Sequence, residues 1–167
     1  VDMGEEGYVL VIWVNPEADE SLVGRAFLRD RLVVVASPDL GRPEDDRPVP
    51  AVVRGGDGRS GVWPLMAPGG RSRIAFEPVL TLSSLIMIRD AVRVGVGAAS
   101  LPISLVSRDL AAGRLVHWGD VDAPEIALWT LYPSRRLLSA RVSAFLDHLR
   151  QAFPHGTPDE LTAFVGS

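Results

Sequence analysis

The sequence predicts an α/β fold, because strand-like and helix-like segments alternate along most of its 167 residues. Residues 8–14 (YVLVIWV) form a continuous apolar run rich in β-branched and aromatic side chains, which is typical of a strand buried on both faces. Residues 138–153 instead repeat apolar side chains at helical spacing. This alternation favours a mainly parallel sheet covered by helices.

The first half of the chain is expected to consist mostly of strands. Strands are predicted at residues 21–29, 31–36, 62–66 and 73–82. The last two are separated by Ala67-Pro68-Gly69-Gly70, which predicts a hairpin or a meander. Pro48 and Pro50 frame a stretch expected to be irregular, and residues 54–61 (RGGDGRSG) are expected to form a flexible surface loop.

The second half carries clear helix boundary signals. Ser83 or Ser84 is placed to cap a helix that ends at Gly95, and Ser139 to cap the last long helix, which Pro154 stops. Gly113 is expected to end the helix between them. The expected helices cover residues 84–94, 104–112, 139–153 and about 159–164, and the expected strands cover residues 98–101, 115–118 and 126–132.

Composition excludes several kinds of chemistry. The chain has no cysteine, and all 17 of its basic residues are arginine, so thiolate nucleophiles, disulfides and lysine Schiff bases are excluded. A net charge of −4 with dispersed arginines argues against DNA binding by this segment. No apolar run is long enough to cross a bilayer, and no signal peptide is visible, so a cytoplasmic location is expected. The initial Val1, in place of Met, suggests that the sequence is a fragment, a processed form or an incomplete one.

No catalytic set, metal site or cofactor site is predicted. The histidines at positions 117, 148 and 155 lack metal-ligand spacing. Gly95-Val96-Gly97 follows a helix and precedes a strand, which is the reverse of the order in a dinucleotide-binding loop. It is expected to be a helix C-cap followed by a tight turn. These absences favour a binding module over an enzyme.

Ser83-Ser84 is the most informative polar pair. It lies where an apolar strand meets a helix N-terminus, so two hydroxyls and free backbone N–H groups are available to hold an anion. A plain N-cap is the other interpretation of the same two residues, and the sequence leaves both open.

Several segments together resemble the effector-binding domain of LysR-type transcriptional regulators. Residues 1–12 resemble the family's V-D-L-x-x-E-G-[FY]-D-[LV]-A-I segment, and residues 19–25 its D-S-S-L-V-A-R segment. Further similar segments are residues 32–38 (LVVVASP), 89–102, with R-D-A, G-V-G and S-L-P, 109–116 (DLAAGRLV), 131–136 (LYPSRR), 141–142 (RV) and 144–147 (AFLD). Their order is that of the family, and they cover nearly the whole chain.

The resemblance implies a type 2 periplasmic-binding-protein-like fold, with two Rossmann-like lobes joined by two crossing strands. Lobe I would be residues 1–37 and 128–167, and lobe II residues 38–127. The crossing strands would be residues 32–37 and 127–132. It also implies that the chain is truncated, with the winged helix-turn-helix and the first strand–helix–strand unit of lobe I lying outside it. Val9, Trp13 and Asn15 depart from the family's usual acidic, basic and glycine residues.

The resemblance also implies a ligand pocket between the lobes. Its lining would comprise Ser37, Pro38, Leu82, Ser83, Ser84, Leu101, Pro102 and Trp129, with Tyr132 as the alternative to Trp129. The expected effector is a small organic acid, often aromatic. The expected partners are this effector, a second copy of the chain in a homodimer or a tetramer, and DNA through the missing N-terminal domain. A membrane partner is not expected. A solute-binding protein of the same fold and an enzyme on this fold remain as alternatives.

Overall fold

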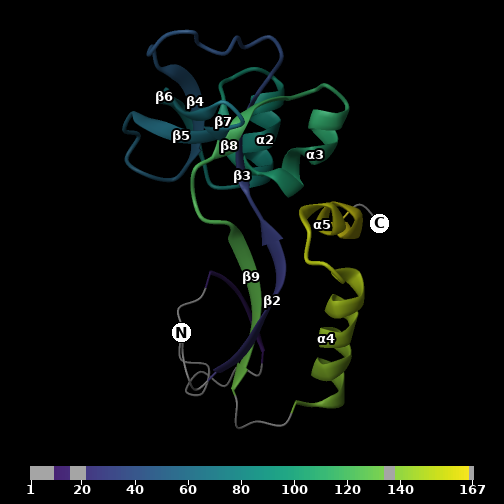
Figure 1. Ribbon diagram of the computed structural model, residues 1–167. Helices are drawn as coiled ribbons and strands as arrows, with labels where there is room; N and C mark the ends of the chain where they lie inside the picture. The colour runs from purple at the N-terminus through teal and green to yellow at the C-terminus, as the bar shows by residue number, and fades with distance from the viewer. Residues whose placement is uncertain (1–9, 16–21, 134–137, 166–167) are drawn as a thin grey trace. The chain divides into compact units, whose positions relative to one another are not determined.

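The computed structural model describes residues 10–15, 22–133 and 138–165, which form two compact units (Figure 1). Unit 1 comprises Val1–Asp30 and Glu125–Ser167, and unit 2 comprises Arg31–Pro124. The chain therefore passes between the units at 30/31 and 124/125, earlier than the expected boundaries at 37/38 and 127/128. The reason is strand pairing. The first expected crossing strand pairs entirely with strands of unit 2, and the second pairs entirely with strands of unit 1.

Unit 1 contains a small antiparallel sheet and two helices. The strands are β1 (Val11–Val14), β2 (Leu22–Asp30) and β9 (Ile126–Pro133), in the order β1-β9-β2, and the helices are α4 (Ala140–Ala152) and α5 (Pro158–Val165). Ile12 and Val14 on β1 are exposed, so the expected burial of this strand on both faces is wrong for these two residues. The expected strand began at Tyr8, and Tyr8 and Val9 lie outside the described residues.

Asn15 ends β1 in a conformation that explains one departure from the family pattern. Its φ is 44°, in the left-handed region that glycine and asparagine tolerate best. Its backbone N–H donates to the carbonyl of Ala127 at 2.9 Å, and its Oδ1 accepts from the N–H of Ala127 at 2.7 Å. Asparagine thus replaces glycine here without loss of the turn.

Unit 2 contains a six-stranded sheet and two helices. The strands are β3 (Leu32–Ala36), β4 (Val49–Arg54), β5 (Gly61–Ala67), β6 (Gly70–Leu82), β7 (Ala99–Pro102) and β8 (Val116–Val121), in the order β4-β6-β5-β8-β3-β7. The helices are α2 (Leu85–Arg93) and α3 (Ile103–Ala111). One parallel bridge, between Ala51 and Ala98, links the first and last strands of this order.

Two expectations for unit 2 are wrong. Of the paired strands in the described residues, β4 and β6 alone run parallel, so the sheet is mainly antiparallel rather than mainly parallel. The stretch framed by Pro48 and Pro50 was expected to be irregular, yet Pro50 lies inside β4. Pro50 lacks an N–H, but its carbonyl accepts from the N–H of Ala98 at 2.8 Å, so the strand keeps this hydrogen bond.

The local predictions are largely confirmed. The predicted hairpin is β5 and β6, with Ala67 opposite Gly70 across the turn. Ser84 caps α2 and Ser139 caps α4, each accepting from the backbone N–H three residues later. Gly95 and Gly113 follow α2 and α3 with φ of 86° and 74°, as helix-ending glycines do.

The core of unit 2 consists of two apolar clusters. The first includes Val33, Val52, Ile88, Leu101 and Val106, and it joins the sheet to α2 and α3. The second includes the large side chains of Trp63, Leu65, Ile74 and Trp118, with Phe76 stacked on Trp63. This packing holds the strand ends that carry the predicted site residues.

Candidate ligand site

Several predicted site residues of unit 2 meet at one edge of the sheet. β4 runs parallel to the C-terminal part of β6, with Arg54 opposite Leu82. β7 runs in the same direction as β4, because Ala51 and Ala98 form a parallel bridge. The C-terminal ends of β4, β6 and β7 therefore share one edge. This edge, called the α2 edge below, carries Arg54, Leu82, Ser83, Ser84 and Pro102.

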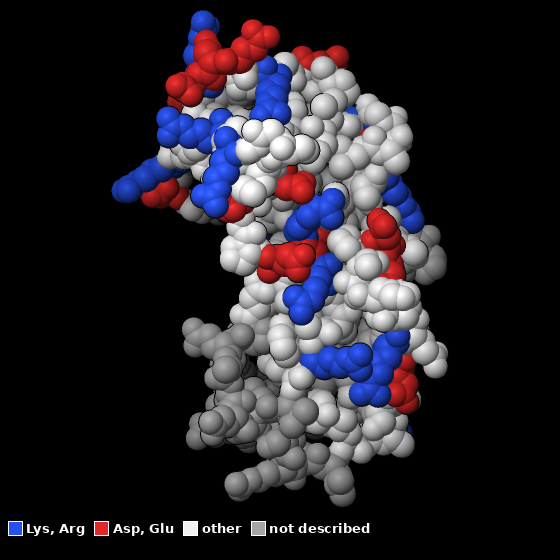
Figure 2. Space-filling view, viewed as in Figure 1, with Lys and Arg blue, Asp and Glu red and all other residues white. Residues whose placement is uncertain are grey.

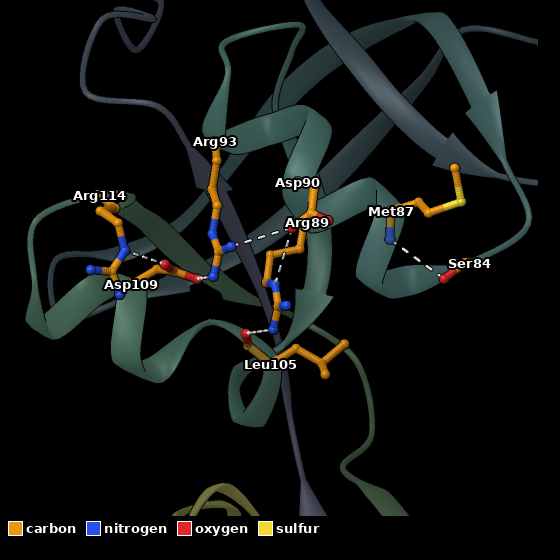
Figure 3. Close-up of polar contacts among 8 residues, drawn as sticks. All are labelled: Ser84, Met87, Arg89, Asp90, Arg93, Leu105, Asp109 and Arg114. Atoms are coloured by element: carbon orange, nitrogen blue, oxygen red, sulfur yellow. Dashed lines mark hydrogen bonds and ion pairs between the residues drawn. The ribbon is translucent and has the colours of Figure 1, made fainter. Parts of the chain in front are cut away.

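Ser83 and Ser84 connect β6 to α2 at this edge. The Ser84 hydroxyl accepts from the Met87 backbone N–H at 3.4 Å, which is the ordinary N-cap role (Figure 3). Ser83 is exposed. The first turn of α2 contains no acidic side chain, so the positive end of the helix dipole faces no carboxylate of its own helix. Ser84 is thus the N-cap of α2, and the predicted ligand role of the exposed Ser83 stays a prediction.

Leu101 is placed differently from the prediction. It has no solvent exposure, because it is packed in the first core cluster against Val33. Its side chain therefore packs in the core beneath the surface of the α2 edge and is not available to a ligand at that surface. The next residue, Pro102, is half-buried and precedes α3 directly. Leu82 is also half-buried and packs against the same cluster.

Ser37 and Pro38 do not join this group. β3 is antiparallel to β7, with Leu32 opposite Pro102 and Val35 opposite Ala99. Because Ser37 follows β3, it lies at the far end of the strand from Pro102. The Ser37 hydroxyl accepts from the backbone N–H of Asp39 at 3.3 Å, and Ser37 is 4% exposed, so it stabilises a turn. Trp129 lies on β9 of unit 1, opposite Ala26 and Trp13, and its predicted ligand role stays a prediction.

Arg54 is a site residue that the sequence interpretation missed. It was assigned to a loop, but it ends β4 directly beside Leu82, one residue before Ser83 along the neighbouring strand. It is exposed, and no carboxylate partner is found for it among the described residues. A cation beside an uncompensated helix N-terminus attracts anions. The signal that could have revealed Arg54 was the Val52-Val53 pair, which has strong strand propensity.

Comparison with known proteins identifies the family. The sequence model of the LysR substrate binding domain family matches residues 1–154. The chain belongs to this family. Two similar curated proteins are the HTH-type transcriptional regulator PtxR of Pseudomonas aeruginosa, 31% identical over 53% of this chain and 29% of its own, and the HTH-type transcriptional regulator DmlR of Escherichia coli, 27% identical over 95% of this chain and 54% of its own. The LysR-type domain thus spans about half the length of such relatives, or less.

Solved structures agree on the fold. The LysR-type transcriptional regulator CrgA of Neisseria meningitidis matches with a TM-score of 0.72 and 22% identity, over 91% of this chain and 54% of its own. The regulatory domain of AphB from Vibrio vulnificus matches with a TM-score of 0.68 and 21% identity, over 90% of this chain and 78% of its own. The LysR-type domain described here therefore has the periplasmic-binding-protein-like α/β fold. The named relatives are transcriptional regulators rather than enzymes, and the solute-binding alternative is not favoured.

The segment that resembles the family most literally, residues 109–116, has a structural role in this LysR-type domain. The Asp109 carboxylate is 1% exposed and accepts from Arg93 at 2.7 Å and from Arg114 at 2.6 Å (Figure 3). Burial alone would raise the pKa of Asp109, but the hydrogen bonds and charges of the two guanidinium groups outweigh it and hold the pKa below the ordinary value. Asp109 therefore ties α2 to the turn that follows α3.

Arg89 makes a second link between the two helices. Its Nη1 donates to the carbonyl of Leu105 at 3.1 Å, so a residue of α2 contacts the first half of α3 (Figure 3). Ser84 is the N-cap of α2 and Pro102 directly precedes α3, so this contact fixes the spacing of two segments of the α2 edge. The buried Arg89 Nε has no hydrogen-bond partner among the described residues, and Asp90 Oδ1 is 3.8 Å away.

Other chemistry finds little support in the described residues. His117 Nε2 lies 2.8 Å from Asp120 Oδ1 on the exposed surface of β8. No group of three or more potential metal ligands occurs in the part of the chain that the structure describes. On the face shown in Figure 2, basic and acidic side chains are interspersed and form no single basic surface. No helix in the described ranges combines the length and the apolar character that spanning a membrane requires.

Proposed function

We propose that this LysR-type domain senses a small organic anion at the α2 edge of unit 2. The observation that carries the proposal is the convergence of Arg54, Ser83 and the N-terminus of α2 at the C-terminal ends of three strands. Ligands of open α/β sheets bind outside the carboxyl ends of the strands. Leu82 and Pro102 supply apolar surface beside these groups, which suits a carboxylate with an apolar or aromatic body.

The sensing is allosteric rather than catalytic. The bound anion favours one arrangement of the domain over another, and it shifts the population only as far as its affinities for the two arrangements differ. In the whole regulator, that shift changes the geometry of a homodimer or tetramer and repositions winged helix-turn-helix segments on DNA in the cytoplasm. The curated relatives are named HTH-type transcriptional regulators, which supports this assignment.

The proposal is tested by thermal-shift titration of the purified chain with small aromatic and aliphatic carboxylates. A ligand at about 100 times its Kd stabilises the folded state by about 2.7 kcal/mol, which raises the Tm measurably. Ser83→Ala should weaken binding several-fold by removing a hydroxyl. Ser72→Ala is the matched control, because Ser72 is an exposed serine of β6, the strand that leads to Ser83, and lies outside the α2 edge.

Ser84→Asp separates anion binding from capping. Aspartate is as good an N-cap as serine, so the Tm without ligand should not fall. Its carboxylate would repel an anion held at the start of α2, so the ligand-induced rise in Tm should disappear. An unchanged rise in Ser84→Asp and Ser83→Ala would show that the ligand binds elsewhere.

A further inference from the structure

Unit 1 contains a cavity that shares no residue with the α2 edge of unit 2. The cavity has a volume of about 360 Å³ and lies between β2 and α4, and residues 153–156 close one end. In Figure 1, α4 lies beside the ribbon formed by β2 and β9. Pockets for small molecules have volumes of roughly 300–1,000 Å³. This cavity is therefore large enough for a small ligand only.

Packing of α4 against β2 gives the cavity an apolar side. α4 reaches the sheet through Leu149 and Phe153, which form an apolar cluster with Leu28. Leu146, Leu149 and Phe153 give the cavity an apolar floor, since each is no more than 6% exposed.

The described residues that line the cavity include three arginines, Arg25, Arg29 and Arg150, and no Asp or Glu. Unit 1 as a whole has more acidic than basic residues, so this grouping runs against its charge balance. The arginines therefore make the cavity complementary to an anion.

The ion pairs that these arginines make are weak, so their guanidinium groups can still bind an anion. Arg29 is 3.6 Å from Glu125 and Arg150 is 3.1 Å from Asp147, and both pairs are largely exposed, so each is weak. No carboxylate partner of Arg25 is found in the described ranges. A guanidinium that is not held tightly binds a carboxylate with two parallel hydrogen bonds. The Tyr132 side chain, on the same wall, adds an aromatic surface and a hydroxyl.

We infer that unit 1 carries a second ligand site, in this cavity, for a small carboxylate with an aromatic or branched apolar body. Arg25 and Arg150 hold the carboxylate at the mouth, and the apolar body lies on Leu146, Leu149 and Phe153. This site does not depend on the proposed site at the α2 edge, because no residue is shared between them.

The test is an NMR titration of the ¹⁵N-labelled 167-residue chain with benzoate, benzamide and acetate as probes. Benzoate should shift amide signals of β2 and the C-terminal half of α4. Benzamide lacks the charge and acetate lacks the apolar body, so the affinity of each should be at least about tenfold lower than that of benzoate. Arg150→Gln and Arg25→Gln should each weaken benzoate binding about tenfold. Arg141→Gln is the control, because Arg141 is an exposed arginine of the same helix outside the cavity lining.

Three outcomes would contradict the proposed site in unit 1, and each contradicts a different part of it. Shifts confined to α2 and the end of β6 would overturn the unit 1 site and leave the α2 edge proposal standing. Shifts in unit 1 that benzamide reproduces at equal affinity would overturn the carboxylate assignment. Absence of any shift at millimolar benzoate would overturn the second site. If one arginine variant lost its dispersed spectrum, the other variant and the three-probe comparison would still decide.

Discussion

At the scale of single residues, Asp109 is a buried carboxylate of unit 2 that two arginines hold. A buried carboxylate with two guanidinium partners is stabilised only while both partners remain, because its desolvation is costly. Asp109→Asn removes the carboxylate charge and replaces one of the two acceptor oxygens by an NH₂ group, which cannot accept from an arginine; a hydrogen bond to a charged group contributes about 1.5–3 kcal/mol. We expect the free energy of unfolding to fall by about 2–3 kcal/mol, measured by chemical denaturation.

Asp147→Asn is the matched control for this prediction. Asp147 also pairs with an arginine, Arg150 at 3.1 Å, but both side chains are largely exposed. Exposed pairs contribute about 0–1 kcal/mol, so the control should leave stability almost unchanged. Equal losses in the two variants would contradict the importance of burial at Asp109.

The stabilising effect of Asp109 also has a defined pH dependence. Its pKa is lower in the folded protein than in the unfolded chain, where an aspartate titrates at about 3.9. The contribution is therefore complete above that value and is lost as the pH falls through the lower folded pKa. The stability difference between the wild-type chain and Asp109→Asn should be full at neutral pH and should narrow below about pH 4. A difference that is the same at acid and neutral pH would contradict this assignment.

At the scale of elements, the sequence was sufficient wherever the structure depends on neighbours along the chain. Ser84, Ser139 and Gly113 act through hydrogen bonds and dihedral angles within a few residues, so their types alone located the helix ends. The strand β4 was missed, because Pro50 normally argues against a strand. The hydrogen bond from Ala98 that accommodates Pro50 comes from a segment distant in sequence.

The candidate site shows the same limit. That a serine of the Ser83-Ser84 pair caps α2 is a local fact, and it was predicted; the structure gives this role to Ser84. That Ser37 lies away from Pro102 follows from the antiparallel pairing of β3 with β7, and strand direction leaves no local trace in composition. Arg54 was missed for the same reason, since only the register of β4 against β6 brings it to Leu82.

The glycine at position 97 gives a test of element packing. A Cβ at Gly97 would lie 2.6 Å from the Pro50 carbonyl oxygen, and backbone atoms cannot move as a side chain does. The backbone of Gly97 is next to the Ala98–Pro50 hydrogen bond that joins β4 to β7. Gly97→Ala should therefore lower the free energy of unfolding by about 1–3 kcal/mol, measured by urea denaturation.

Gly41→Ala is the control for Gly97→Ala. No atom lies within 4 Å of the Cβ position at Gly41, and its φ is not in the left-handed region. This variant should be neutral or slightly stabilising, because alanine restricts the unfolded chain. A neutral Gly97→Ala would show that β4 and β7 move apart at little cost.

At the scale of the whole molecule, the two units differ in how much core they possess. Unit 2 is one continuous stretch of chain with two apolar clusters, whereas the described core of unit 1 consists mainly of Leu28, Leu149 and Phe153. Unit 1 is also assembled from two stretches that all of unit 2 separates in sequence, so its closure costs more entropy. A small core with a costly closure opens more often than a large one.

Hydrogen exchange should resolve this difference. Amides of β3 and β8 in unit 2 should exchange more slowly than those of β2 and β9 in unit 1, because they open only when the larger core opens. Leu149→Ala, which removes a residue of the unit 1 core, should speed exchange in unit 1 and leave β3 unchanged. Val34→Ala, in the core of unit 2, is the reciprocal variant and should speed exchange in β3 and β8. If Leu149→Ala accelerated exchange equally in both units, the two would unfold as one cooperative body, and a ligand bound in unit 1 would stabilise unit 2 by the same amount.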